Sequence, residues 1–496
     1  MLIWGCNVNK CWREDFMKLR IAQKISFKGL TFIVALFFFY VVSDNNSVEA
    51  AVEETVIEPV YTDSSLIKER IQNFSEKEQK ALMTQAVEKQ YVLEAINQTF
   101  ESYSDFEKVA TVYLTDEGKI VIGLKETESE KLEMFKTIIK GKDINNKIEF
   151  KKVENSITDL MRIRDTIVAD LNSSTMYLNT ESIMTDIDVE NNIIGISIEE
   201  LQPYQLEAVT EVITNSTQIN AIGTSDKTLL TTPSIIDFTD LPNKGTFSDL
   251  IIEETKIELK KHTKEDIPNS ELSRKRNWTK LGGGITLHDA NTADCTSAGM
   301  AKKGSTYFLL TAGHCLNADN SYVYQDSAIV GIDHSIGSWN RTDVGLIKIT
   351  DDNTLNERRA SNHFYEYAEN LSDYDQSITG AGVAWQNEYV CKSGNATGVT
   401  CGYIFRYDAT YTPRNYNYTL SGSEIQSTSV NIDYSTGGDS GSITYDPSTN
   451  VIYGVHSAGI NSYGYMTRIQ DVIKLYSDAN NAFTIYTSNS TPVIAN

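Results

Sequence analysis

The chain has 496 residues, more than a single domain usually contains. Its apolar fraction of 40% is that of a globular protein, and its net charge of −23 argues against nucleic acids and anionic membranes as partners. We therefore expect a multidomain globular protein with an acidic, solvated surface.

The first fifty residues carry the pattern of an export signal. A basic segment, 18–28, precedes an apolar stretch, 30–42, that is too short to span a bilayer comfortably, and Val48-Glu49-Ala50 ends in a small-residue cleavage site. Residues 1–50 are therefore predicted to be a signal peptide, and an uncleaved membrane anchor is the alternative. Met17 is a better candidate for the true start than Met1, because the residues just before it are acidic. Cleavage would leave a secreted, extracellular protein with no membrane attachment.

Residues 51–279 are rich in Glu and Lys and are patterned for mixed α and β structure. The spacing of apolar residues predicts helices over 75–100, 126–139 and 156–171. Hairpins are expected over 109–124 and 183–198, with turns at 116–118 and 190–192. Residues 224–270 have the composition of a linker with a short helix near 248–261. Arg274-Lys275-Arg276 follows and is expected to be exposed, either as a site that a protease could cut or as a solvated basic patch.

From residue 281 the sequence has the texture of an all-β domain. Short strand-like runs are separated by turn residues, and a helix is expected over 469–475. This pattern indicates a barrel or a sandwich. The strand-like runs cover 306–311, 321–324, 344–349, 451–456 and 484–486.

Four cysteines lie in this C-terminal half. An even number in an exported chain indicates two disulfides. A metal site is the weaker alternative, because no two of the four have the C-x₂-C spacing and histidines are scarce. We expect neither a metal nor a cofactor. The four are Cys295, Cys315, Cys391 and Cys401.

The stretch 437–442, Gly-Gly-Asp-Ser-Gly-Ser, has the composition of a turn that exposes a serine nucleophile, Ser440, although such a stretch is also common in ordinary turns. A serine nucleophile needs a base, and the base needs an orienting carboxylate. His314, which follows an apolar strand, is the candidate base. Asp343, just before the strand at 344–349, is the candidate carboxylate. The alternatives are Asp333 and Asp351.

The segments 310–315 (LTAGHC), 342–346 (TDVGL) and 438–441 (GDSG), in this order, resemble the motifs of chymotrypsin-fold serine proteases. Residues 390–402 (VCKSGNATGVTCG) are similar to the disulfide loop of the streptogrisin and α-lytic protease branch. The resemblance covers 281–496 and implies two six-stranded antiparallel β-barrels, residues 280–372 and 373–496. It also implies the disulfides Cys295–Cys315 and Cys391–Cys401. Members of this branch carry a pro region that assists folding and inhibits the enzyme, which implies an α+β pro region over 51–279.

The resemblance implies a role for each matching residue. Ser440 would attack the scissile carbonyl, His314 would transfer the proton, and Asp343 would orient the imidazole. The N–H groups of Gly438 and Ser440 would form the oxyanion hole. Asp439 would pair with Lys392, where the branch usually has an Arg that offers a bidentate fork.

The resemblance also implies a specificity pocket, expected to be formed by Ser435, His456, Ser457 and Gly459. The main chain of 457–459 would pair with an extended substrate strand. His456 resembles the pocket histidine of glutamyl endopeptidases, and a cation or an N–H donor favours an anionic side chain, to which Ser435 could add a hydroxyl. Cleavage after Glu, and less readily after Asp, is the resulting hypothesis. A core histidine in an enzyme with a non-acidic preference is the alternative.

The sequence thus predicts a monomeric, secreted serine endopeptidase that acts on proteins or peptides. A non-catalytic binding protein on a protease scaffold is the alternative from another class.

Overall fold

The computed structural model divides the chain into two compact units, Met1–Val52 and Glu53–Asn496. The described residues belong to the second unit. The expected signal peptide and the linker at 224–270 lie outside the described residues. The structure describes residues 64–115, 117–125, 129–142, 145–173, 183–198, 274–289, 294–317, 320–337, 342–350, 358–366, 373–412, 420–428, 433–460 and 462–494.

Residues 64–198 form an α+β region, as the sequence predicted. The expected helix over 75–100 consists of α4 (Glu76–Met83), a π-helical turn (Thr84–Glu88) and α5 (Lys89–Thr99). It begins with a capping box, in which Ser75 Oγ accepts the Glu78 N–H and the Glu78 carboxylate accepts the Ser75 N–H. The remaining helices are α3 (Ser64–Ile71), α6 (Tyr103–Glu107), α7 (Ser129–Lys140), a 3₁₀ turn (Asn145–Lys147) and α8 (Ile157–Ser173).

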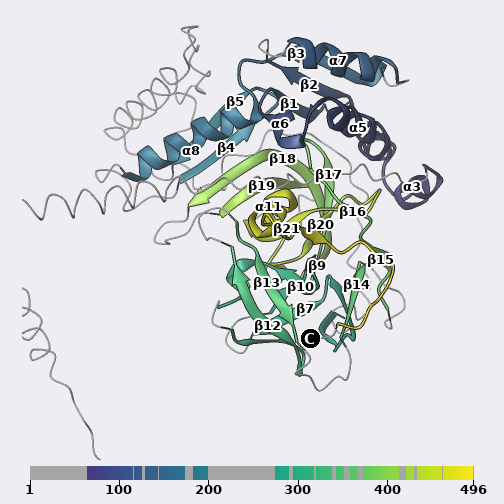
Figure 1. Ribbon diagram of the computed structural model, residues 1–496, viewed down its shortest axis with the longest axis vertical. Coiled ribbons are helices and arrows are strands. Elements are labelled where there is room, and N and C mark those ends of the chain that lie inside the picture. The colour runs from purple at the N-terminus through teal and green to yellow at the C-terminus, as the bar shows by residue number, and fades with distance from the viewer. Residues whose placement is uncertain are drawn as a thin grey trace, which may run out of the picture. The chain divides into compact units, whose positions relative to one another are not determined.

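The first expected hairpin is confirmed as part of a three-stranded sheet, β1-β2-β3. Strands β1 (Ala110–Leu114) and β2 (Ile120–Leu124) are antiparallel, and β3 (Ile148–Lys152) runs parallel to β2. All residues of β1 and β2 are buried, which explains why both strands read as continuous apolar runs. Helices α5 and α7 lie beside this sheet (Figure 1).

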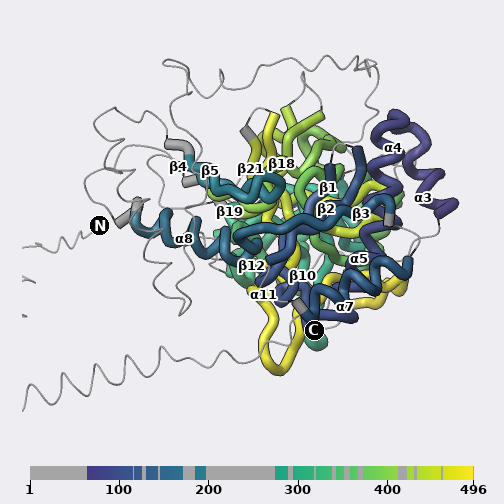
Figure 2. The backbone as a smooth tube through the Cα atoms, turned by 90° about the horizontal axis from the view of Figure 1, so that it is seen from above, coloured from purple at the N-terminus to yellow at the C-terminus, as the bar shows by residue number. Residues whose placement is uncertain are grey.

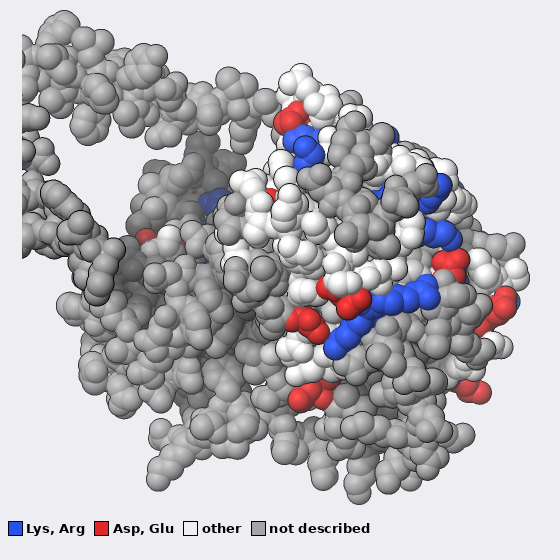
Figure 3. Space-filling model, turned by 90° about the horizontal axis from the view of Figure 1, so that it is seen from below, with Lys and Arg blue, Asp and Glu red and all other residues white. Residues whose placement is uncertain are grey.

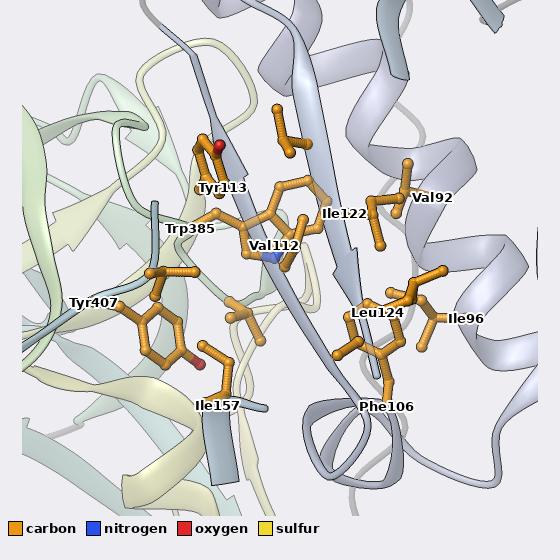
Figure 4. Close-up of a cluster of buried hydrophobic side chains, with 14 of the residues drawn as sticks. Val92, Ile96, Phe106, Val112, Tyr113, Ile122, Leu124, Ile157, Trp385 and Tyr407 are labelled. Carbon is orange, nitrogen blue, oxygen red and sulfur yellow. The ribbon is translucent and has the colours of Figure 1, made fainter. Parts of the chain in front are cut away.

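One apolar core joins this region to the C-terminal half of the chain. In Figure 4, side chains of α5 and β2, such as Val92 and Ile122, lie near Trp385, and all three are buried. Trp385 Nε1 donates to the Tyr103 hydroxyl at 2.8 Å. Burial of a large apolar side chain contributes about 1.5–3 kcal/mol. The core therefore stabilises the N-terminal region and the β-rich half together.

The β-rich half begins with a curved sheet whose order is β23-β9-β10-β13-β12-β11-β7-β8. Its last member in the chain, β23, pairs with β9, so the segment 373–496, expected to form the second barrel, also supplies a strand to the first sheet. The strands are β7 (Thr286–Asp289), β8 (Cys295–Thr296), β9 (Gly299–Lys303), β10 (Thr306–Thr311), β11 (Tyr322–Gln325), β12 (Ala328–Ile336), β13 (Gly345–Ile349) and β23 (Phe483–Ile485). A small sheet of β6 (Lys280–Gly283), β14 (Arg359–Phe364) and β15 (Gln376–Ser377) accompanies it.

The second curved sheet has the order β17-β20-β21-β22-β19-β18-β4-β5. The β-rich half forms a closed six-stranded barrel and a curled half-barrel, which is the chymotrypsin-like double-barrel class that was expected. The helix expected over 469–475 is α11 (Ile469–Tyr476). The strands of this half are β16 (Gly380–Ala381), β17 (Tyr389–Gly394), β18 (Gly398–Thr412), β19 (Leu420–Ser427), β20 (Ile443–Tyr445), β21 (Val451–Ile460) and β22 (Tyr463–Arg468).

The second sheet is extended by a hairpin from the N-terminal region. The hairpin expected over 183–198 is confirmed as β4 (Ile183–Asp188) and β5 (Ile193–Ile198). Strand β4 pairs antiparallel with β18, from Asp408 opposite Ile187 to Thr412 opposite Ile183. In Figure 2, the tube of the hairpin lies beside β18, in agreement with this pairing. The N-terminal region and the β-rich half therefore share one sheet.

The expectation that the basic run at 274–276 is exposed is wrong for Arg274, whereas Lys275 and Arg276 are partly exposed. The Arg274 side chain is buried, and its guanidinium donates to Gly284 O at 2.7 Å, Glu366 O at 3.0 Å and Ser393 Oγ at 3.0 Å. Glu366 and Ser393 lie far from Arg274 in the chain, and a local basic pattern does not predict such partners. Arg274 thus belongs to the body of the β-rich half, although the sequence placed its start at 280.

Charged residues of both signs are interspersed among uncharged ones on the described part of the face in Figure 3. Among the described helices, none combines the length and the apolar character needed to cross a bilayer.

Candidate active site

His314 and Asp343 meet because neighbouring strands carry them. His314 lies in a 3₁₀ turn (Gly313–Cys315) after β10, Asp343 precedes β13, and these strands pair with Thr311 opposite Gly345. Asp343 Oδ2 lies 2.7 Å from His314 Nδ1, and Oδ1 accepts the main-chain N–H of His314 at 2.9 Å. The carboxylate is therefore held in one orientation. The structure brings Asp343 to the histidine, and the alternative Asp351 lies outside the described residues.

Each member of this pair shifts the pKa of the other. Burial by itself lowers the pKa of His314, but the hydrogen bond and charge of Asp343 outweigh burial, so the pKa is raised. Burial raises the pKa of Asp343, but hydrogen bonds from His314 and Ser457 outweigh it, so the pKa is lowered. The Ser457 hydroxyl donates to the same Oδ2. The site thus favours an imidazolium beside a carboxylate, as a proton-accepting histidine requires.

Ser440 lies in a tight turn between two glycines with positive φ. Gly438 has φ +105° and Gly441 has φ +88°, values that favour glycine. A Cβ on Gly441 would also come closer than 3.0 Å to Thr296 O and to Thr311 Oγ1. The Ser440 hydroxyl donates to Ser457 O at 3.2 Å. Among the described contacts it makes no hydrogen bond to His314, so attack would first require a rotation about χ1.

The turn that carries Ser440 pairs only some of its main-chain N–H groups with acceptors among the described residues. Asp439 N–H donates to Thr436 O at 3.1 Å, and Gly441 N–H donates to His456 O at 2.7 Å. Within the described part of the chain, the N–H groups of Gly438 and Ser440 have no acceptor. They are the two groups expected to form the oxyanion hole.

Asp439 is fully buried, and Lys392 Nζ lies 3.1 Å from its Oδ2. Its carboxylate also accepts the N–H groups of Ala396, Thr397 and Thr436 and the Thr397 hydroxyl. Burial opposes ionisation, but Lys392 and these hydrogen bonds outweigh it and lower the pKa of Asp439. Burial lowers the pKa of Lys392 to about 8, although Asp439 opposes this. Thr397 thus bridges the expected pair, since it also accepts from Lys392 Nζ at 2.7 Å.

The four expected pocket residues lie on β21 and on the segment before the nucleophile turn. His456 is completely buried, and both of its ring nitrogens lack a hydrogen-bond partner among the described residues. Burial, reinforced by the charge of Lys392, lowers the pKa of His456 to about 3, so its imidazole is neutral. Ser435 Oγ occupies the space that a Cβ on Gly459 would need. Of the residues expected to form the pocket, His456 thus has an imidazole with unused hydrogen-bonding capacity.

Both expected disulfides are confirmed, Cys295–Cys315 and Cys391–Cys401. The first joins β8, the strand that also contains Thr296, to the turn that carries His314. Within the described residues, no group of three or more His, Cys, Asp or Glu side chains is arranged to hold a metal ion.

Sequence reasoning missed Thr296 and Thr397. Each is buried or half-buried and bonds the nucleophile turn directly. A signal existed for both, because Thr296 follows Cys295 and Thr397 lies inside the Cys391–Cys401 loop. A threonine that a disulfide holds in place can serve as a fixed hydrogen-bond donor.

No family model and no curated protein sequence matches this chain. Several solved structures show a partial likeness. Thermobifida fusca protease A shares 22% identity with a TM-score of 0.34, and the match covers 42% of this chain and 100% of that one. A glutamic acid-specific serine protease, described as using a histidine triad in substrate binding, shares 23% identity with a TM-score of 0.31 over 42% of this chain and 100% of that one. Nocardiopsis protease shares 22% identity with a TM-score of 0.31, and the match covers 41% of this chain and 99% of that one. At such TM-scores these likenesses carry no argument about the activity of this chain.

Proposed function

We propose that the chain is a secreted serine endopeptidase, made as a preproprotein, that acts through His314, Asp343 and Ser440. One observation carries the proposal. The 2.7 Å contact between His314 Nδ1 and Asp343 occurs together with a serine turn in which the N–H groups of Gly438 and Ser440 have no acceptor among the described residues. Base, orienting carboxylate, nucleophile and oxyanion donors are the four parts that acyl transfer needs.

The reaction begins when the Ser440 hydroxyl turns from Ser457 O toward His314. Oγ bonds to the scissile carbonyl carbon, its proton passes to His314 Nε2, and the carbonyl electrons move to the oxygen. That oxyanion accepts hydrogen bonds from the N–H groups of Gly438 and Ser440, and one such donor stabilises the transition state by about 3 kcal/mol. Asp343 stabilises the imidazolium throughout.

The tetrahedral adduct then collapses. The C–N bond breaks, and His314 gives its proton to the leaving amine, so that an ester on Ser440 remains. Water attacks this ester as His314 takes up its proton. The second collapse returns the proton to Ser440 Oγ and releases the new carboxyl terminus.

A fluorophosphonate probe tests this proposal, because it reacts with an activated serine whatever the substrate preference. The secreted protein should be labelled, and Ser440→Ala should abolish labelling. Ser442→Ala, two residues away in the same motif, should retain it. Failure of the wild type to react would favour a binding protein on a protease scaffold, and labelling that persists in Ser440→Ala would place the nucleophile elsewhere.

Contacts of residues 64–198 with the β-rich half support a pro region. Lys89 and Glu388 form a buried ion pair at 2.7 Å. The Gln85 amide pairs with both main-chain groups of Tyr389, at 2.9 and 3.0 Å. These contacts hold the start of β17 in place. The same strand carries Lys392, which pairs with Asp439, the residue before Ser440. A region that orders this strand would assist folding of the site.

Two measurements test whether the protein is made with a signal peptide and a pro region that are later removed. N-terminal sequencing of the secreted protein should show that both the signal and the pro region are removed. Deletion of residues 51–198 should sharply lower the yield of probe-reactive protein. A secreted protein that begins near residue 51 and reacts with the probe would contradict the inhibitory role of the pro region.

We further propose that the enzyme cleaves after Glu, and less readily after Asp. The buried His456, whose ring nitrogens lack partners among the described residues, supports an N–H donor for a substrate carboxylate. Ser435 Oγ lies beside Gly459, which is on the same strand as His456. A carboxylate bound there would raise the pKa of His456, so binding would take up a proton. The preference for Glu over Gln should therefore weaken as pH rises.

A peptide-library cleavage profile tests the preference directly. His456→Leu should lower kcat/KM for Glu substrates at least tenfold more than for Gln substrates. Preference of the wild type for aromatic, small or basic residues would remove the hypothesis and leave His456 as a core histidine.

A further inference from the structure

We infer that Thr296 is a positioning residue for the oxyanion hole, an inference that rests on the proposed function. Thr296 is completely buried at the end of β8. Its main-chain N–H donates to Ser440 O at 2.7 Å, and its hydroxyl donates to Gly438 O at 2.7 Å. One residue of the first sheet thus holds both carbonyls of the residues whose N–H groups form the hole.

The direction of the Thr296 hydroxyl is fixed. Its oxygen accepts the Asn395 N–H at 3.0 Å, so its single proton is directed to Gly438 O. Thr296 is itself held, because its carbonyl accepts the Thr311 hydroxyl at 2.8 Å. The Cys295–Cys315 disulfide ties the same strand to the turn of His314. Thr296 therefore links the loop of the base to the loop of the nucleophile.

Gly438 needs this restraint more than other residues do. Its φ of +105° lies where glycine alone moves easily, so its backbone is not confined by a side chain. The hydrogen bond to Gly438 O orients the peptide plane that follows Gly438, and the bond to Ser440 O orients the plane that follows Ser440. Each donor residue is thus anchored on its carbonyl side, which limits the movement of its own N–H group before substrate arrives. Preorganised donors of this kind need no rearrangement during the reaction.

The central test replaces Thr296 by Val in the full chain, which removes the hydroxyl and keeps the shape. Outright loss of an oxyanion donor lowers kcat by about 10²–10³-fold. Since Thr296→Val loosens the donors without removing them, we expect kcat to fall about 10- to 100-fold, with KM changed less than about threefold. Affinity for a peptidyl aldehyde, whose adduct places an oxyanion in the hole, should fall in parallel with kcat/KM.

Thr286→Val is the matched control. Thr286 lies opposite Thr296 in the β7–β8 pairing and is equally buried, but its hydroxyl donates to Asn395 Oδ1 at 2.6 Å and not to the nucleophile turn. It should keep kcat within about threefold of wild type. Thr296→Ser, which retains the donor, should restore most of the activity lost in Thr296→Val.

If Thr296→Val does not fold, Thr296→Ser and Thr296→Ala carry the test, because they differ only in the hydroxyl. Serine should exceed alanine at least tenfold in kcat. Equal kcat in Thr296→Ser and Thr296→Ala, or equal losses of kcat in Thr296→Val and Thr286→Val, would overturn this inference and leave the proposed function standing. A wild-type protein that neither cleaves peptides nor reacts with fluorophosphonate would overturn the proposed function and this inference with it.

Discussion

Replacing Asp343 by Asn should disable the base without unfolding the protein, and the geometry explains why. The main-chain N–H of His314 donates to Oδ1, so an Asn at 343 must place its amide oxygen there. The amide NH₂ then occupies the Oδ2 position, facing His314 Nδ1. It donates to Nδ1, which forces the imidazole proton onto Nε2. An Nε2 that carries a proton cannot accept the proton of Ser440.

The size and the pH dependence of this effect follow from the same contact. In Ser-His-Asp proteases the equivalent change lowers kcat about 10⁴-fold, or about 5.4 kcal/mol of transition-state stabilisation. In the wild type, both influences that raise the pKa of His314 come from Asp343, and burial opposes them. Without that carboxylate, burial prevails, so the pKa of His314 falls below its usual value. The acid limb of the pH–rate profile should therefore move to lower pH.

The assay is the second-order rate constant for fluorophosphonate labelling between about pH 4 and 9, because this rate does not depend on substrate preference. Asp446→Asn is the matched control. Asp446 is an equally buried carboxylate that accepts the Ser448 N–H at 2.8 Å and makes no described contact with the triad. It should label within about threefold of wild type. A loss below tenfold in Asp343→Asn, or an acid limb that moves to higher pH, would refute the reasoning.

Further predictions concern folding, and inactive Ser440→Ala protein allows them to be measured by thermal or urea unfolding. Gly441→Ala should yield no folded protein, because its Cβ would overlap buried atoms, whereas Gly437→Ala should be tolerated, since no atom lies within 4 Å of its added Cβ. Lys392→Met should destabilise the fold by about 3 kcal/mol, because it leaves the buried Asp439 carboxylate without a cation; a loss below 1 kcal/mol would contradict this. Lys89→Met should cost about 3–5 kcal/mol because Glu388 is fully buried. The exposed pair of Lys108 with Asp105 is the control, and Lys108→Met should cost about 0.5 kcal/mol; equal losses in the two variants would show that burial of the pair is unimportant.

The sequence predicted the elements well where local pattern decides them. Short strand-like runs bounded by turn residues located β10, β13 and both N-terminal hairpins, because strand and turn preferences act over a few residues. The motifs also named His314 and Asp343, which the structure brings into contact. What the motifs did not contain is the orientation of the Ser440 hydroxyl, which donates to Ser457 O. That orientation depends on side-chain rotation, and no sequence pattern encodes it.

The failures of prediction share one physical cause, which is the burial of polar residues by partners far away in the chain. Composition assigns Lys and Arg to the surface, because their charges are costly to bury alone. Arg274 and Lys89 are nevertheless buried, since acceptors about 90–120 and 294–299 positions away pair with them. The partners of Thr296 on the nucleophile turn lie 142 and 144 positions on. Such pairs form only after the two curved sheets and the N-terminal hairpin have docked, so they depend on the completed topology. The residues that hold the site in place are for this reason harder to predict from sequence than the residues that would carry out the reaction.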